Sequence, residues 1–489
     1  MKYINFKHVI LLAFITMLSC SDDFVFVDSE NENSEDFFNS EEDYQNALIA
    51  AYDLLQSTNF VNVMVGEIAS DNTLAGGESA TDTPGIQQID DMIHTPVNQQ
   101  LRDLWGWMYA GINRTNYIME FKNKTPFSGI EGVLAQTRFL RAYYYFELVK
   151  WFGDVPLVVD QRILYGDQFE INRTPAADVY AQMELDLIYA IENLPYTQAE
   201  EGRITKGAAQ ALLGKVYLYQ EKFTESATVL EDVINNGPYD LLVDYSTMFE
   251  NDNENNIESV FEIQYTDQQG ASFDCFQCSE GNISVGYSGP RSYTGPLFET
   301  GFSFNVPTQE VVDAFEEGDM RLETAILDIE AWAASTGATY GTGNEHTGYF
   351  NRKYIPRQGD SNIGDANLTN PNNYRSIRFA DVLLMAAEAL NRGNIDDNRA
   401  RNYLNRVRER AFGNSDNNVS TSGASLTSDI YHERRVELVG EGHRFFDLVR
   451  TGRAASEIDG FQTGKNELFP IPSIEIELSG NRWDQNPGY

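Results

Sequence analysis

Two stretches of the chain carry the pattern of paired helices that pack back on each other. In the first, the segment 205–220 places Ala211 and Gly214 among large apolar residues, and a second periodic segment, 223–235, follows after a short turn. Small residues let two helix backbones approach closely, and aromatic residues fill the space around them. The segment 378–391 and its successor 397–411 repeat this pattern. We therefore expect helices that bury their apolar faces against one another.

Apolar residues at spacings of three and four extend the helical pattern over much of the chain. The segments are 41–57, 61–71, 98–122, 130–151 and 174–194, and Gly153-Asp154-Val155-Pro156 ends the fourth. Part of that fourth segment, 136–149, fits the paired set. The pairs are separated by long insertions, so they do not recur every roughly 34 residues. The sequence predicts a mainly α fold: a tetratricopeptide-like helical-hairpin scaffold with long irregular loop and short-strand insertions.

Residues 41–489 are expected to form a single domain. Its helical scaffold is predicted at about 41–260 and 372–453, with an extended, proline-bearing tail at 454–489. Between the scaffold halves, residues 264–371 are rich in Gly, Ser, Thr, Asn and aromatic residues, with one predicted helix at 308–317. Long segments without periodicity inside a compact domain usually carry function.

The N-terminus has the pattern of a secretory signal. Lys2 and Lys7 precede an apolar run at 9–18, and Cys20 follows a small residue. This order predicts a lipoprotein signal peptide at 1–19 and acylation of Cys20, while a soluble signal peptide with an incidental cysteine is the alternative. The acidic, Ser/Asn-rich residues 20–40 are expected to form a flexible tether between the lipid anchor and the folded body.

Composition excludes several classes of function. The chain has 35 Lys+Arg against 74 Asp+Glu, a net charge of −39, so it lacks the basic surface that nucleic acids require. After the N-terminal segment, no stretch has the ~20 apolar residues of a membrane span. Three cysteines and five histidines leave little from which to assemble a metal site or a Cys/His catalytic pair.

Four blocks, in order, resemble the SusD/RagB family of Bacteroidetes outer-membrane nutrient-uptake lipoproteins. They are RFLRAYYYFELV at 138–149 with WFGDVP at 151–156; the helices 204–220 and 376–393; ERRVELVGEGHRFFDLVRTGR at 433–453; and FPIP at 469–472 with DQNPGY at 484–489. The acidic segment after Cys20 also resembles the tether of surface-exposed lipoproteins in that phylum.

The resemblance implies a glycan-binding lipoprotein, or a peptide-binding one as in the RagB branch. It implies a SusC-like TonB-dependent barrel as partner, a place on the outer membrane facing the exterior, and attachment through the lipid anchor alone. It also implies delivery of the ligand for uptake without catalysis. No nucleic acid and no cofactor are expected.

Three carboxylates in the third block offer the alternative of a surface glycoside hydrolase. Glu433, Glu437 and Glu441 recur every four residues, and such enzymes use paired carboxylates. Arg434, Arg435 and Arg444 are close by in sequence, and ion pairs would keep the acids ionised instead of raising a pKa. We therefore favour an ion-pair network that includes Asp447, with His443 packed.

Two further motifs bear on cofactors. Cys275 and Cys278 favour a short-loop disulfide on an exported chain, with reduced thiols, zinc or redox chemistry as alternatives. The segment 251–256, NDNENN, hints at a structural calcium site but lacks the glycine and distal glutamate of an EF-hand loop, so a solvated turn is preferred.

A sugar site needs flat aromatic rings with hydrogen-bonding groups around them, because an unpaired hydroxyl is costly to bury. Two regions supply both, and the first, the loop to about residue 96, matches the ligand platform of the family. The candidate ligand-binding residues are Asp71, Asn72, Tyr287, Arg291, Tyr293, Trp332, Tyr340 and Tyr349, with Phe350 beside them. Trp105, Trp107 and Trp151 lie on scaffold helices and are expected in the core.

The acidic composition favours a neutral ligand such as a β-glucan. Arg291, Arg352 and Arg357 leave a local anionic site open.

Overall fold

The computed structural model describes residues 37–489 except 59, 165, 168–169 and 360–362. The predicted signal peptide, Cys20 and the tether up to residue 36 lie outside the described residues. In the part of the chain that is described, outside these gaps, no helix is both long enough and apolar enough to cross a membrane.

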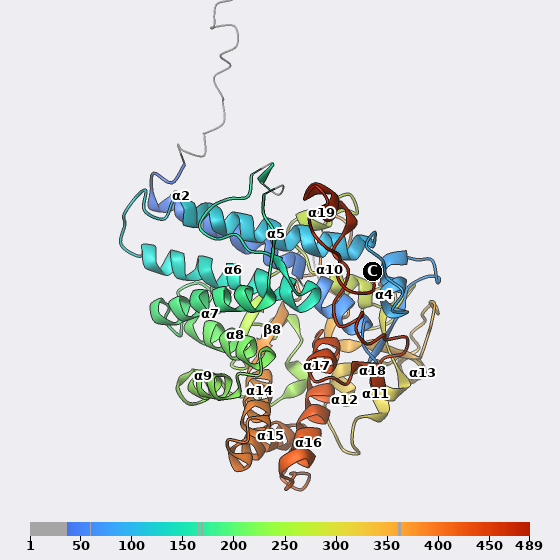
Figure 1. Ribbon diagram of the computed structural model, residues 1–489. Coiled ribbons are helices and arrows are strands. Elements are labelled where there is room, and N and C mark those ends of the chain that lie inside the picture. Colours follow the sequence, from blue (N-terminus) through green and yellow to red (C-terminus); the bar gives the residue numbers. More distant parts are fainter. Residues whose placement is uncertain (1–36, 59, 165, 168–169, 360–362) are drawn as a thin grey trace, which may run out of the picture.

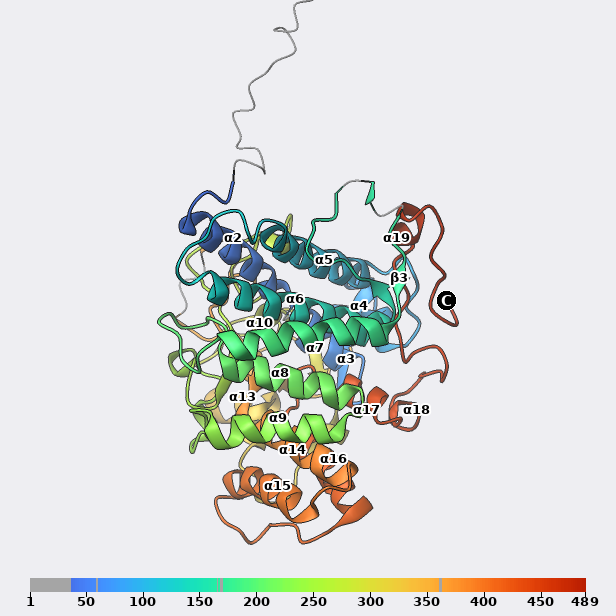
Figure 2. The ribbon, with the colours of Figure 1, turned by 60° about the vertical axis from the view of Figure 1, so that its left-hand side comes forward.

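Antiparallel helices stacked in one direction form the body (Figures 1 and 2). The long ones are α2 (Glu41–Asp53), α5 (Gln99–Glu120), α6 (Ile130–Phe152), α7 (Ala176–Asn193), α8 (Lys206–Tyr219), α9 (Phe223–Asn236), α14 (Phe379–Arg392), α15 (Asp397–Phe412) and α16 (Gly423–Glu437). Each of the helices from α5 to α8 packs on the next one along the chain. Helix α9 also packs on α14, and α14 packs on α15, so the stack continues through these two helices. The expected mainly α scaffold of helical hairpins is therefore confirmed.

Helix α6 lies between α5 and α7 in this stack. Its residues are apolar nearly all round, and a helix of that kind is stable only when it is covered on every side. Phe139, Tyr144 and Trp151 are fully buried, and Trp105 on α5 is nearly so, as expected for the core. Trp107 is only half-buried, against Phe60.

The packed body begins before α2. Phe38 lies within the predicted tether, yet it is fully buried against Tyr44, Tyr117 and Phe121. Two residues later, the Ser40 side chain caps α2 by accepting a hydrogen bond from the Asp43 amide.

A two-stranded antiparallel ribbon joins the insertion to the scaffold. The chain leaves the scaffold through β4 (Ser259–Ile263) and returns through β8 (Tyr374–Arg378), which leads directly into α14. The ribbon packs on α8, so both ends of the insertion are fixed at one point of the helical stack.

The insertion is more regular than expected. It contains α10 (Ile283–Ser288), α11 (Gln309–Asp313), α12 (Leu322–Ala325), α13 (Ile329–Thr336), β5 (Phe304–Pro307), β6 (Ile326–Asp328) and β7 (Tyr349–Asn351). The length predicted for the helix at 308–317 is wrong, because α11 ends at Asp313. Phe315, two residues later, packs in a small apolar cluster. Figure 1 shows α11, α12 and α13 on the side of the molecule away from α6–α9.

The remaining short elements lie in the loop around β1, between α6 and α7, and after α16. They are α3 (Gly66–Ile68), α4 (Pro84–Asp90), β1 (Thr73–Gly76), β2 (Val155–Pro156), β3 (Arg173–Thr174), α17 (Arg444–Arg450), α18 (Ala454–Glu457) and α19 (Ser473–Leu478). The helix expected at 61–71 is instead a π turn followed by one α turn. The tail is not wholly extended, because α18 and α19 interrupt it.

Candidate functional site

The two regions expected to supply ligand-binding residues meet in a small antiparallel sheet. Strand β1 pairs with β5, with Thr73 opposite Pro307 and Gly76 opposite Phe304. Gly76 has φ +72°, and a Cβ there would lie 2.3 Å from the Ser303 carbonyl oxygen, so only glycine fits this approach. The loop after β1 and the insertion, more than 220 residues apart in sequence, therefore form one surface.

Two carboxylates bind successive backbone amides of β1. Asp90 accepts a hydrogen bond from the Ala75 amide at 2.7 Å, and Glu345 accepts one from the Gly76 amide at 3.1 Å. Burial raises the pKa of Asp90 to about 7, and the nearby Glu345 carboxylate adds to the rise. Glu345 thereby fastens the segment around Tyr340 to the N-terminal loop.

Arg291 contacts both parts of this surface. Its guanidinium donates to the Phe302 carbonyl at 3.1 Å and lies 3.5 Å from the Asp82 carboxylate, with about a quarter of the side chain exposed. Its own carbonyl accepts from the Gly341 amide at 2.7 Å. Arg291 therefore links the aromatic residue Phe302 on one side to the segment after Tyr340 on the other.

Aromatic side chains with accessible area lie in the segments that contact or adjoin Arg291. Phe302 and Tyr340 are half-buried, and so is Trp332 on α13, whose indole N–H donates to the Tyr293 hydroxyl at 2.8 Å. Tyr340 packs against His346. We call the surface formed by Asp82, Arg291, Phe302, Trp332 and Tyr340 the binding platform. A charged donor, a carboxylate and three partly exposed rings are the groups that a sugar needs.

The structure places the other sequence candidates elsewhere. Tyr287 and Tyr293 are 5% and 7% exposed: Tyr287 packs among Phe60, Phe276 and Phe302, and the Tyr293 hydroxyl donates to the Pro296 carbonyl. Both support platform residues from beneath instead of presenting their own faces. Phe350 is fully buried.

Tyr349 also lies apart from the platform. It packs with the α11 cluster, and its hydroxyl donates to Gln309 at 3.0 Å.

Asp71 and Asn72 belong to the scaffold. The Asp71 carboxylate accepts two hydrogen bonds from Arg444 at 2.7 Å and lies 2.8 Å from Arg435. Asn72 is fully buried, with its amide donating to Glu67 at 2.9 Å. These contacts fix the start of β1 against the end of α16.

Sequence reasoning missed Asp82 and Phe302. Both lie in the regions singled out for their loop character, but nothing in their local pattern distinguishes them from neighbouring acids and aromatic residues. Only the β1–β5 pairing brings them together.

The three glutamates weighed as catalytic acids lie in a buried ion-pair network. Glu433 contacts Arg321 at 2.6 Å, and Glu441 contacts Lys353 at 2.6 Å. Glu437 is bound by Arg321, Arg378 and Arg410, and their charges hold its pKa well below the usual range against the effect of burial. None of the three glutamates is more than 1% exposed.

The network differs from the one expected in its partners. Arg434 pairs with Asp381 and Asp447, and Arg435 and Arg444 hold Asp71, so the cations that bind the glutamates come from other segments. His443 is packed, as expected, and burial lowers its pKa to about 3, with the nearby Lys215 charge adding to the effect.

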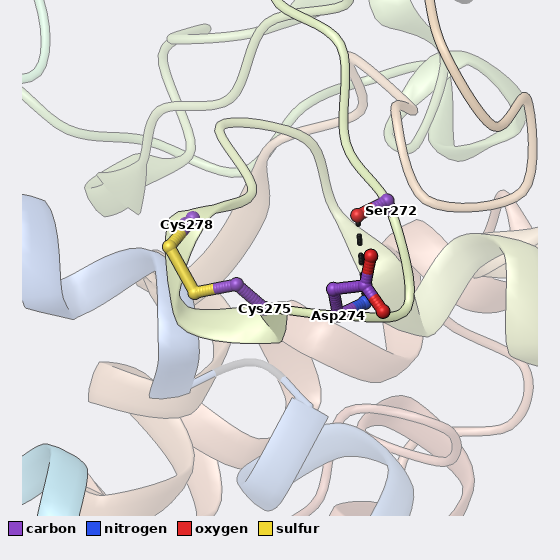
Figure 3. Close-up of a disulfide and its surroundings, with 4 residues drawn as sticks. All are labelled: Ser272, Asp274, Cys275 and Cys278. Carbon is purple, nitrogen blue, oxygen red and sulfur yellow. Dashed lines mark hydrogen bonds between the residues drawn. A yellow bond between two sulfur atoms is a disulfide. The ribbon is translucent and has the colours of Figure 1, made fainter.

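The structure also describes the two cysteines and the segment 251–256 that was considered for calcium. Cys275 and Cys278 are joined by a disulfide (Figure 3). The segment 251–256 begins with a 3-10 turn, Asn251–Asn253, whose Asn253 amide donates to Thr247. Within the described part of the chain, no three His, Cys, Asp or Glu side chains are grouped to hold a metal ion.

Family models match most of the chain in two parts. Residues 257–467 match the model described as SusD family, and residues 23–218 match one described as starch-binding associating with outer membrane. Among curated sequences, SusD-like protein P2 of Formosa agariphila is 28% identical over 99% of this chain and 100% of its own length.

Solved structures with the same fold include proteins whose titles name a glycan. A laminarin-binding SusD-like protein is 37% identical, with a TM-score of 0.85 over 92% of this chain and all of its own. Surface glycan-binding protein A from Bacteroides thetaiotaomicron, in complex with laminarihexaose, is 27% identical, with a TM-score of 0.81 over 91% of this chain and 99% of its own.

Proposed function

Because the chain belongs to the SusD family, we propose that it is a non-catalytic surface lipoprotein that binds a glycan at the binding platform and delivers it to a SusC-like TonB-dependent barrel. Cys20 would carry the lipid that holds it on the outer membrane, facing the cell exterior.

The platform is the observation that carries this proposal. Arg291 is held by the Phe302 carbonyl and by Asp82, so its guanidinium is positioned before a ligand arrives and loses little side-chain entropy on binding. Trp332 is likewise fixed by its hydrogen bond to Tyr293. Rings offer contact area to sugar C–H groups, and Arg291 and Asp82 offer a donor and an acceptor for hydroxyls.

A β-1,3-glucan is the ligand class that we favour. Two solved relatives are described as bound to, or binding, laminarin or a laminarin oligosaccharide. The net charge of −39 also opposes the approach of polyanionic polysaccharides, whereas it has no long-range effect on a neutral glucan.

The absence of catalysis is part of the proposal. A glycosidase needs two carboxyl groups facing a cleft, one of them with a raised pKa. Glu433, Glu437 and Glu441 are instead buried among arginines. Asp90 does have a raised pKa, but its carboxylate faces the β1 backbone through the Ala75 amide.

The test is a binding screen with a chemical readout. The purified mature protein is run in affinity electrophoresis gels containing laminarin, a mixed-linkage β-glucan, starch or alginate, and matched incubations are assayed for new reducing ends. We expect retardation by laminarin, none by alginate and no reducing ends.

The other outcomes of this screen would favour a different function. New reducing ends would overturn the non-catalytic assignment. Retardation by none of the glycans would favour the peptide-binding alternative, which titration calorimetry with peptide mixtures would then examine. Delivery is tested separately, by recovering the barrel partner with the lipoprotein from detergent-solubilised outer membranes.

A further inference from the structure

A disulfide closes the loop that contains Cys275 and Cys278 (Figure 3), and this loop meets the binding platform where Phe273 contacts Phe302. Cys275 precedes a single 3-10 turn, Phe276–Cys278, and Cys278, its last residue, is exposed. Linking residues so close in sequence removes little entropy from the unfolded chain, and a chain of this size does not need a staple for its core. The effect of the bond is therefore local to this loop.

The loop holds two phenylalanines in different settings. Phe276 is half-buried, with its ring centroid 6.0 Å from that of Phe60 and 6.3 Å from that of Tyr287. Phe273 is 54% exposed, and its ring lies 5.8 Å from Phe276 and 5.9 Å from Phe302. Phe273 thus packs against Phe276 in its own loop and against Phe302 of the platform, and the rest of its side chain is exposed to solvent.

Backbone contacts add to the support of this loop. The Cys278 amide donates to the Cys275 carbonyl at 3.2 Å, and the Ser279 hydroxyl donates to the Leu368 carbonyl at 2.8 Å. The disulfide closes the turn in between. These contacts fix the turn that follows Phe273, whose ring lies beside Phe302 and is 54% exposed.

Polar groups accompany the exposed ring. Ser272 and Asp274 precede and follow Phe273, both are exposed, and the Asp274 amide donates to the Ser272 hydroxyl at 3.4 Å. Through Phe302 the loop is continuous with Arg291, whose guanidinium binds the Phe302 carbonyl. An open ring with a carboxylate and a hydroxyl beside it, in line with the platform, provides the groups that a further sugar residue would use.

We propose that Phe273 forms an outer sugar-stacking subsite that extends the binding platform beyond Phe302, and that the Cys275–Cys278 disulfide holds it in place. This inference rests on the proposed glycan-binding function. Long oligosaccharides reach the outer subsite, whereas short ones occupy only the platform around Arg291. Reduction of the disulfide releases the loop and removes the contribution of Phe273 alone.

The experiment compares two ligands and two kinds of variant by titration calorimetry. The probes are laminarihexaose and laminaritriose, and the proteins are wild type, Phe273→Ala, Phe273→Tyr and the double variant Cys275→Ser/Cys278→Ser. We expect Phe273→Ala to bind the hexaose roughly three- to tenfold more weakly and the triose as wild type does. Phe273→Tyr keeps the ring and should keep the affinity.

The role of the disulfide has its own comparison. The double serine variant should bind the hexaose more weakly by the same factor, and adding Phe273→Ala to it should cost no more. A reductant should weaken hexaose binding by wild type and Phe273→Tyr, but not by the variants that lack the ring or the disulfide. Leu185→Ala, which removes another exposed apolar side chain on the distant α7, serves as the control for surface truncation.

Four results would overturn the inference in whole or in part. Equal hexaose binding by Phe273→Ala and wild type removes the outer subsite while leaving the platform proposal intact. An equal loss for both ligands moves Phe273 into the central site. A loss in Phe273→Ala without one in the serine variant removes the role of the disulfide. Failure of wild type to bind either glucan would instead refute the proposed ligand, and the subsite with it.

Discussion

Arg378 and Glu437 form an ion pair, with 2.8 Å between Nη1 and Oε1, in which neither side chain is exposed to solvent. Glu437 also forms ion pairs with Arg321 and Arg410. Arg378 also forms ion pairs with Glu258 and Glu441. Charges that are fully removed from water must be matched, because a buried charge without a partner is costly. The network therefore joins α16 to α15, to β8 and to the residue before β4, and through Arg321 it connects the helical stack to the insertion.

Glu437→Gln should destabilise the protein strongly. The substitution leaves three arginines with one negative charge fewer in a site that water does not reach. Breaking a buried pair in this way costs about 3–5 kcal/mol, and the loss is measured as a lower midpoint of urea unfolding at an unchanged slope. Arg399→Gln removes a cation from the partly exposed pair with Glu231 and should cost less than about 1 kcal/mol. Equal effects of the two variants would show that the network contributes no more than a surface pair.

Two helical glycines should respond to alanine in opposite directions. A Cβ on Gly214 of α8 would lie 2.4 Å from Leu230 of α9, so Gly214→Ala should lower the free energy of unfolding by about 1–3 kcal/mol. A Cβ on Gly106 of α5 meets no atom within 4 Å, so Gly106→Ala should raise it by about 0.5–1 kcal/mol through helix propensity. Urea unfolding measures both. If both variants lost stability, the conclusion that Gly214 lies at a close helix contact and Gly106 does not would be wrong.

Asp90 should make the platform region less stable as the pH rises. Burial raises its pKa from 3.8 to about 7, so between these values the native chain keeps a proton that the unfolded chain releases. The contribution of this group to the free energy of unfolding therefore falls with rising pH across that window and is constant above it. Asp90→Asn cannot ionise, so its advantage over wild type should grow from pH 4.5 to pH 8, to at most about 4 kcal/mol.

The measurement is urea unfolding at a series of pH values for wild type and Asp90→Asn. Asp416→Asn removes the same formal charge from an exposed residue that does not act on the pKa of Asp90, and so corrects for the general effect of net charge. A difference between Asp90→Asn and wild type that does not change with pH would contradict the assigned proton.

The scaffold helices could be predicted from the sequence because periodicity and helix-ending residues are local features of the chain. The periodicity of 98–122 and 130–151 predicts α5 and α6 to within two residues, and Gly153, at φ +69°, ends α6. Ala211 and Gly214 likewise predict the close packing of α8 on α9, where Gly214 meets Leu230. These features follow from side chains within a few turns of each other.

The binding platform depends on contacts that no local pattern encodes. Strands β1 and β5 have four residues each, too few for an alternating pattern to stand out, and their pairing spans more than 220 residues. Asp71 has a residue type suited to ligand binding, but two distant arginines bind it. Tyr287 and Tyr293 are buried for the same reason: burial is a property of the assembled insertion and not of its composition.

Tyr340 and Tyr349 form a matched pair for testing the platform. Both are half-buried tyrosines of the insertion, but Tyr340 precedes the Gly341 amide that binds Arg291, whereas Tyr349 is tied to Gln309 on α11. Tyr340→Ala should weaken laminarihexaose binding roughly three- to tenfold, since it removes a ring with its partly exposed face. Tyr349→Ala should leave binding within twofold, because its ring lies outside the platform. Titration calorimetry measures both affinities, and thermal unfolding verifies that both variants are folded. A larger loss in Tyr349→Ala would move the glycan site toward α11 and away from Arg291.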